Sequence, residues 1–140
     1  MSATTFALCV SVAKSHITVE GLWMAFGAHG VLVKAKTHHV TLRGNRLFCN
    51  RSGGIHATGD DHVIEDNEVF RNNMYGIQMR YGLNRVRVAR NLCTFNGPNN
   101  GETTDTSVPA DLSLYSKSSY VLIEDNIVVG LHQNSFRNKY

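Results

Sequence analysis

The chain has 140 residues, of which 42% are apolar and 18% are charged, and its formal net charge is +3 at pH 7. This length allows one domain, and the composition excludes a disordered chain. The mildly basic net charge favours a polyanion such as a uronate polysaccharide as a partner. The basic residues are scattered, which argues against nucleic acid. No apolar run approaches the roughly 18 residues that span a membrane, and the first residues lack the basic start of a signal peptide.

The predicted elements are short strands, and the first lies at residues 9–12. The next strand opens a pattern in which apolar and polar residues alternate, as they do in a strand with one buried face. This pattern recurs with its final positions 23, 22, 24 and 35 residues apart, which is the self-similarity of stacked repeats. Its five copies lie at residues 16–22, 39–45, 61–67, 85–91 and 120–126.

Each copy is followed by a second short apolar stretch, a turn rich in Gly and Asn, and a third strand. The third strands lie at residues 30–33, 54–57, 76–79 and 111–114. No segment is long enough to be a crossover helix, so the strands must pair in parallel with those of neighbouring coils. The sequence therefore predicts an all-β fold, a right-handed parallel β-helix of about five coils of three short strands, as a single domain over residues 1–140.

Recurrent apolar and Asn positions predict the interior of this β-helix. The Asn residues at the bends are expected to form structural ladders that satisfy turn amides; they are Asn45, Asn67, Asn91 and Asn126, with Asn50, Asn72 and Asn96. The inward columns are Ile17, Val40, His62, Val86 and Val121; Val19, Leu42, Ile64, Val88 and Ile123; and Val31, Ile55, Ile77 and Leu112.

The V-x-[VIL]-x-x-N segments and G-[IV]-x-[VLAM] strands cover about residues 6–140. On these motifs the chain resembles the right-handed parallel β-helix superfamily of pectate lyases, polygalacturonases, alginate lyases and mannuronate epimerases. The resemblance implies an extracellular or periplasmic protein that acts on or binds an acidic polysaccharide, in a lyase- or epimerase-like manner. Two alternatives stay open, because one fold hosts many activities: a non-catalytic carbohydrate-binding or structural module, and an inactive fragment of a larger enzyme.

The strand pattern is already under way at Cys9 and begins again at Phe136, whereas members of that superfamily usually carry an N-terminal cap. We therefore expect either a fragment of a longer β-helix or a minimal one. Open sheet ends favour pairing with another copy, so self-association is expected.

The resemblance places a substrate cleft along the outer face of one sheet, here the sheet of the third strands. Elimination or epimerisation of a uronate needs a base, a cation for the carboxylate and a proton donor. We assign these roles to His56, Arg80 and Tyr115. The other outer columns are less polar, which favours this face. The predicted substrate-binding residues are Lys34, Gln78, Asp60, Asp61 and Asp111.

Hydrolysis is the weaker alternative, because it needs paired carboxylates roughly 5–9.5 Å apart. Asp60, Asp61 and Asp111 offer acids, and Gly59-Asp60-Asp61 resembles the Asp-Asp of polygalacturonases, but the companion G-H-G and R-I-K motifs are absent. Binding of Ca²⁺ by the same acids is a further alternative, because Ca²⁺ prefers carboxylate oxygens as ligands. No dense acidic cluster or zinc-type cysteine spacing supports a metal, so no metal site is predicted.

A polar, Gly-rich insertion at about 97–109 lengthens the turn that leads into the last third strand. It predicts a loop that either walls one side of the cleft or is a tolerated surface insertion.

Overall fold

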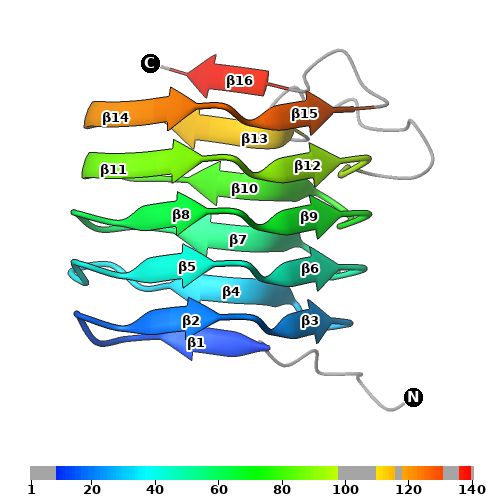
Figure 1. The fold of residues 1–140 in the computed structure, drawn as a ribbon, viewed down its shortest axis with the longest axis horizontal. Helices are drawn as coiled ribbons and strands as arrows, with labels where there is room; N and C mark the ends of the chain where they lie inside the picture. Colours follow the sequence, from blue (N-terminus) through cyan, green and yellow to red (C-terminus); the bar gives the residue numbers. More distant parts are fainter. Residues whose placement is uncertain (1–8, 98–109, 116–117, 131–135, 140) are drawn as a thin grey trace, which may run out of the picture.

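The computed structural model describes residues 9–97, 110–115, 118–130 and 136–139, and in these residues the chain winds as a parallel β-solenoid of three sheets (Figure 1). Sheet A comprises β1 (Val10–Val12), β4 (His29–Val33), β7 (Gly53–Ala57), β10 (Tyr75–Met79), β13 (Ala110–Tyr115) and β16 (Phe136–Lys139). Sheet B comprises β2 (Thr18–Glu20), β5 (Thr41–Arg43), β8 (Val63–Glu65), β11 (Asn84–Ala89) and β14 (Ser119–Glu124). Sheet C comprises β3 (Trp23–Ala25), β6 (Arg46–Phe48), β9 (Glu68–Phe70), β12 (Leu92–Thr94) and β15 (Ile127–Val129).

The predicted fold class is confirmed: each sheet is parallel, and each coil contributes one short strand to each sheet. The coil count differs slightly from the five predicted, because four coils are continuous within residues 9–97 and the fifth, β13–β15, is described only in part. The predicted insertion at about 97–109 lies outside the described residues, apart from Gly97. No membrane-spanning helix is found in the described part of the chain.

The core consists of apolar columns that run from coil to coil. In sheet A the register pairs Val31 with Ile55, and Ile77 with both Ile55 and Leu112, so the column is continuous. These side chains are at most 1% exposed, as the alternation of the strands predicts. Ile17 does not follow its predicted column and is 37% exposed, because β2, the strand it precedes, lies at the end of sheet B with one neighbouring strand.

Two buried asparagine ladders hold successive coils together. The Asn67 carboxamide oxygen accepts hydrogen bonds from both the backbone N–H and the side-chain Nδ2 of Asn45, each at 3.0 Å. Its own Nδ2 donates to the Leu42 carbonyl at 2.9 Å and to Asn91 Oδ1 at 3.0 Å. The same pattern joins Asn50, Asn72 and Asn96 in a second ladder. The predicted structural role of these residues is confirmed.

The left-handed backbone of these bends falls one residue before each ladder Asn, not on the Asn itself. In the first ladder the positions with positive φ are Gly44, Asp66, Arg90 and Asp125. The Asn is therefore free to turn its side chain inward and bridge the neighbouring coils, while the preceding residue makes the turn.

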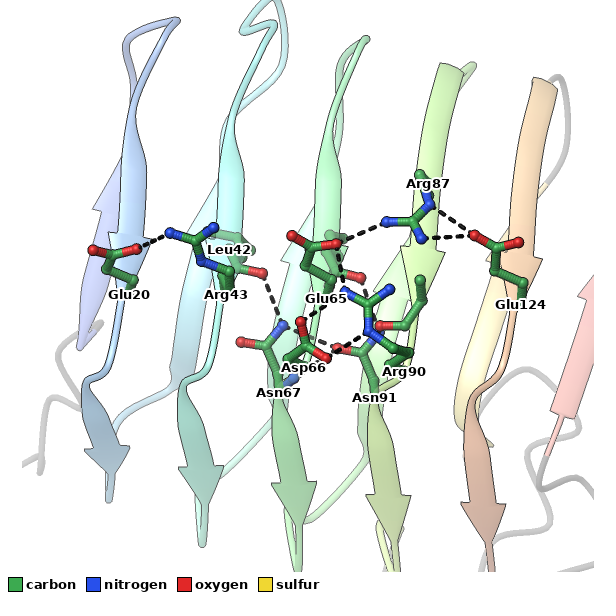
Figure 2. Close-up of polar contacts among 12 residues, drawn as sticks. Glu20, Leu42, Arg43, Glu65, Asp66, Asn67, Arg87, Arg90, Asn91 and Glu124 are labelled. Carbon is green, nitrogen blue, oxygen red and sulfur yellow. Dashed lines mark hydrogen bonds and ion pairs between the residues drawn. The ribbon is translucent and has the colours of Figure 1, made fainter.

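The outer face of sheet B is more charged than the sequence predicts, and its charges alternate in sign (Figure 2). Arg43 pairs with Glu20 at 2.6 Å, and Arg87 lies between Glu65 at 2.7 Å and Glu124 at 2.8 Å. The prediction of a less polar face is wrong because it considered one column of side chains, whereas the next outward column supplies the carboxylates. Such exposed pairs contribute little each to stability, and their opposite charges largely cancel on this face.

Replacing Asn67 by alanine tests the ladder. We expect Asn67→Ala to lower the free energy of unfolding by about 3 kcal/mol, because it leaves the Asn45 amide and the Leu42 carbonyl buried without their partner. Urea denaturation followed by circular dichroism measures the change. Asn73→Ala is the matched control, since Asn73 is exposed on the neighbouring turn. Equal losses in the two variants would contradict a stabilising ladder.

Candidate active site

The outer face of sheet A brings together polar side chains from consecutive coils. The register pairs His56 of β7 with Leu32 of β4 on one side and with Gln78 of β10 on the other, and Gln78 pairs with Ser113 of β13. Neighbouring strands are about 4.8 Å apart, so these residues form one row across the sheet. The expected proximity of His56 and Gln78 is confirmed.

Tyr75 joins this row to the coils below. The tyrosine begins β10, opposite Gly53 of β7, and a Cβ at residue 53 would overlap the Tyr75 ring. The ring therefore lies across Gly53, and its hydroxyl reaches His29 Nδ1 at 3.0 Å and His56 Nδ1 at 3.3 Å. A phenol on one coil thus contacts imidazoles of the two preceding coils.

Sequence reasoning missed Tyr75 and His29 as members of this site. Both lie at the start of their strands, whereas the predicted cleft used residues in the middle and at the end. The available signal was Gly53, which leaves room for a large side chain one coil away.

The three groups form a chain of hydrogen bonds whose direction depends on the tautomers of the two imidazoles. A tyrosine hydroxyl has one proton, so Tyr75 donates to one imidazole and accepts from the other when both imidazoles are neutral. Burial, followed by the positive charges of His29 and Arg80, lowers the pKa of His56 to about 4. Burial and Arg80 also lower the pKa of His29. Both rings are therefore neutral near pH 7, and His56 has the lone pair that a base requires.

Gln78 and Ser113 are buried beside His56, with exposures of 1% and 2%. Among the residues that the structure describes, Gln78 Oε1 and Ser113 Oγ have no hydrogen-bond partner. The prediction that Gln78 is an open substrate contact is not supported by its burial, since it is enclosed in the row between His56 and Ser113. Its unused acceptor instead gives the floor of the site polar character.

Arg80 follows β10 and is half-buried, and its charge lowers the pKa of both histidines, which places it within electrostatic range of them. Lys34 is exposed after β4, in the same outward column as Arg80 but two coils away, about 10 Å. Both cations therefore lie on the side of sheet A where its strands end. Tyr115 belongs to β13, but its side chain lies outside the described residues.

Asp111 is not on the outer face, which corrects its predicted position. It is 1% exposed, and its Oδ1 accepts hydrogen bonds from the Asn96 backbone N–H and Nδ2, both at 2.8 Å. Asp111 occupies the column of Gly76, whose Cβ position faces the Asn96 carboxamide. The carboxylate thus ends the second asparagine ladder and is not placed to bind substrate.

Asp60 and Asp61 lie at the turn between sheets A and B, and their carboxylates have different surroundings. Asp60 lines a surface pocket of about 350 Å³, together with Ala35, Lys36, Thr37, His38, Thr58, Gly59, Tyr81 and Gly82. Asp61 is paired with Arg85 at 2.6 Å, and this hydrogen bond lowers the pKa of Asp61. Because Asp61 is paired with Arg85, and Asp111 is part of a ladder, the three acids do not form the open carboxylate pair that hydrolysis needs.

His62 is confirmed as a hydrogen-bonded core histidine. It is 1% exposed; its Nδ1 accepts the Val40 amide at 3.2 Å, which leaves Nε2–H to donate to the Thr58 carbonyl at 3.0 Å. Burial lowers the pKa of His62, so the ring is neutral and has a structural role.

Comparison with known protein families identifies the architecture. The sequence profile described as the right-handed beta helix region matches residues 29–137. No curated protein and no solved structure matches the chain.

NMR titration of the histidine C2 protons tests the electrostatics of this site. We expect His56 to titrate near pH 4, and Arg80→Gln to raise its pKa, because the variant removes a repelling positive charge. The Arg71→Gln control, which removes an exposed arginine after β9, should leave it unchanged. Since the unfolded imidazole takes up its proton near pH 6.5, His56 contributes stability above that pH and loses it as the pH falls towards 4. An ordinary pKa for His56 in the native protein would rule out the buried arrangement.

Proposed function

We propose, on the premise that the chain belongs to the right-handed β-helix family, that its sheet A face binds an acidic polysaccharide and abstracts a proton from a uronate residue. The reaction class is elimination, as in a polysaccharide lyase, or epimerisation at the same carbon. The observation that carries the proposal is the His29–Tyr75–His56 chain, in which neutral imidazoles flank a phenol beside Arg80.

The first step is removal of the C5 proton of the uronate by His56. The C5–H electron pair is delocalised into the substrate carboxylate, whose added negative charge is stabilised by Arg80. A bound carboxylate also places a negative charge near His56, which raises the pKa of the imidazole from its value in the empty site. Substrate binding therefore strengthens the base at the stage where it must hold the proton.

The second step depends on the reaction. In elimination a C4=C5 double bond forms as the C4–O bond breaks, and Tyr75 gives its proton to the leaving oxygen. In epimerisation C5 takes a proton from solvent water on its opposite face, the proton held by His56 returns to solvent, and the C4–O bond stays intact. In this scheme Tyr75 donates to His29 Nδ1 at 3.0 Å and His56 Nδ1–H donates to Tyr75 at 3.3 Å, so the base is the Nε2 lone pair of His56. After taking the C5 proton in elimination, His56 passes its Nδ1 proton to the Tyr75 phenolate, which restores both groups to their neutral forms. Tyr75 thus takes the donor role that the sequence assigned to Tyr115.

Exchange of the C5 proton with solvent deuterium tests both reactions at once. We expect the protein to remove the C5 proton signal of alginate or pectate oligosaccharides in D₂O, as followed by proton NMR. New ultraviolet absorbance from unsaturated uronate would identify elimination, and its absence alongside exchange would identify epimerisation.

Two variants assign the roles. His56→Gln and Tyr75→Phe should each slow exchange about 100-fold or more, the scale of general acid–base catalysis. Arg71→Gln is the control for a surface substitution and should exchange as the unmodified protein does. Failure of the unmodified protein to exchange C5 protons, or equal rates in His56→Gln, would overturn the catalytic proposal. Saturable oligosaccharide binding without exchange would identify the non-catalytic binding module instead.

A further inference from the structure

A second group of histidines lies apart from sheet A, at the turn that leads from sheet A into sheet B in the first two coils. His16, His38 and His39 are all exposed, and each offers a ring nitrogen within 4.8 Å of the other two. His38 Nδ1 and His39 Nδ1 are 2.9 Å apart. The His16 ring stacks on that of His39, with centroids 4.8 Å apart and planes at 19°.

The stacking of the first two coils brings these three histidines together. The His16 backbone N–H donates to the His38 carbonyl at 3.1 Å, so the first turn sits directly against the second. His16 and His39 share a left-handed backbone, with φ of 59° and 55°. The later turns adopt the same conformation at other residue types, so the backbone is a property of the turn. What distinguishes the first two coils is that their turns present imidazoles at equivalent positions.

The arrangement fits the coordination chemistry of late first-row divalent metals. Zinc binds imidazole nitrogen at about 2.0–2.1 Å in tetrahedral sites, which places neighbouring ligand nitrogens about 3.3 Å apart. The nitrogens of the three histidines lie within 4.8 Å of one another, and the exposed rings can close the remaining gap by side-chain rotation. Three histidines leave a fourth position open, as in catalytic zinc sites.

Two acids lie near these histidines, of which Asp61 is paired with Arg85. The His39 backbone N–H donates to the Asp60 carbonyl at 3.2 Å, so the turn with the two acids stacks directly on the turn with His38 and His39. His38 and Asp60 also line the same pocket of about 350 Å³, although Lys36 lines it as well.

We propose that His16, His38 and His39 form a three-histidine site for Zn²⁺ or a related late first-row divalent metal, at the rim of the Asp60 pocket. The proposal differs from the expectation from the sequence that the chain has no metal site, since a histidine one coil earlier completes the His38–His39 pair. The proposal is independent of the chemistry proposed for sheet A.

Metal titration of the full chain without an affinity tag tests the site. We expect one equivalent of Co²⁺ to bind with the visible absorption of four-coordinate cobalt, and Zn²⁺ to displace it. His16→Asn, His38→Gln and His39→Asn should each weaken binding at least tenfold, and the triple variant should abolish it. Asparagine is used at residues 16 and 39 because it tolerates the left-handed backbone. Circular dichroism verifies that each variant keeps its fold.

The His29→Gln variant is the matched control, since it removes a histidine from sheet A and leaves the three-histidine group intact. It should bind Co²⁺ as the unmodified protein does. Equal affinities of the unmodified protein and the triple variant would overturn the proposal. Unchanged affinity in His16→Asn would overturn the three-histidine geometry, and loss of binding in His29→Gln would place the metal on sheet A instead.

Discussion

The register between successive coils is the constraint on which the structure depends. Asn67 accepts two hydrogen bonds from the preceding coil, and its Nδ2 donates to a carbonyl of that coil and to the ladder asparagine of the next coil. A slip of one residue would turn every apolar side chain of a strand outward and separate the ladder partners. Because buried amides without partners are costly, the ladders and the apolar columns enforce the same register.

Because of that register, residues that are far apart in the sequence come into contact. Tyr75 and His29 are 46 residues apart in sequence, yet their polar atoms are 3.0 Å apart. The same stacking places His16 against His39 at the turn between sheets A and B. The two histidine groups differ in environment: burial keeps His56 neutral, whereas the three turn histidines are exposed. One is therefore suited to acid–base chemistry and the other to binding a cation.

On sheet B the same stacking of coils brings opposite charges together. Its arginines and carboxylates alternate along the stack, so each charge faces an opposite one. On sheet A burial and the positive charge of Arg80 lower the pKa of both His29 and His56, and this positive setting favours an anionic ligand.

The sequence predicts the fold and much of the residue placement because a repeat period assigns each residue to a column. The core of Val31, Ile55 and Ile77 and the buried His62 follow directly from it. The period does not predict how far a side chain reaches along the stack. The Tyr75 ring spans more than one coil spacing and passes over Gly53, so its partners are on two other coils.

The alternation of inward and outward residues also gives a wrong prediction where a strand begins beside an asparagine ladder. Asp111 has the parity of an outward residue, but it lies where the chain leaves the turn, and its carboxylate completes the asparagine ladder. Parity within a strand is therefore a reliable guide at its centre and a poor one at its first residues.

Nuclear Overhauser effects between Tyr75 and the two histidines test the central claim most directly, because they report the coil register and the site together. The account predicts cross-peaks from the Tyr75 ring protons to the imidazole protons of both His29 and His56, whose ring centroids lie 5.9 and 6.1 Å from that of Tyr75. Cross-peaks to neither histidine, in a protein whose histidine and tyrosine resonances are assigned, would contradict it.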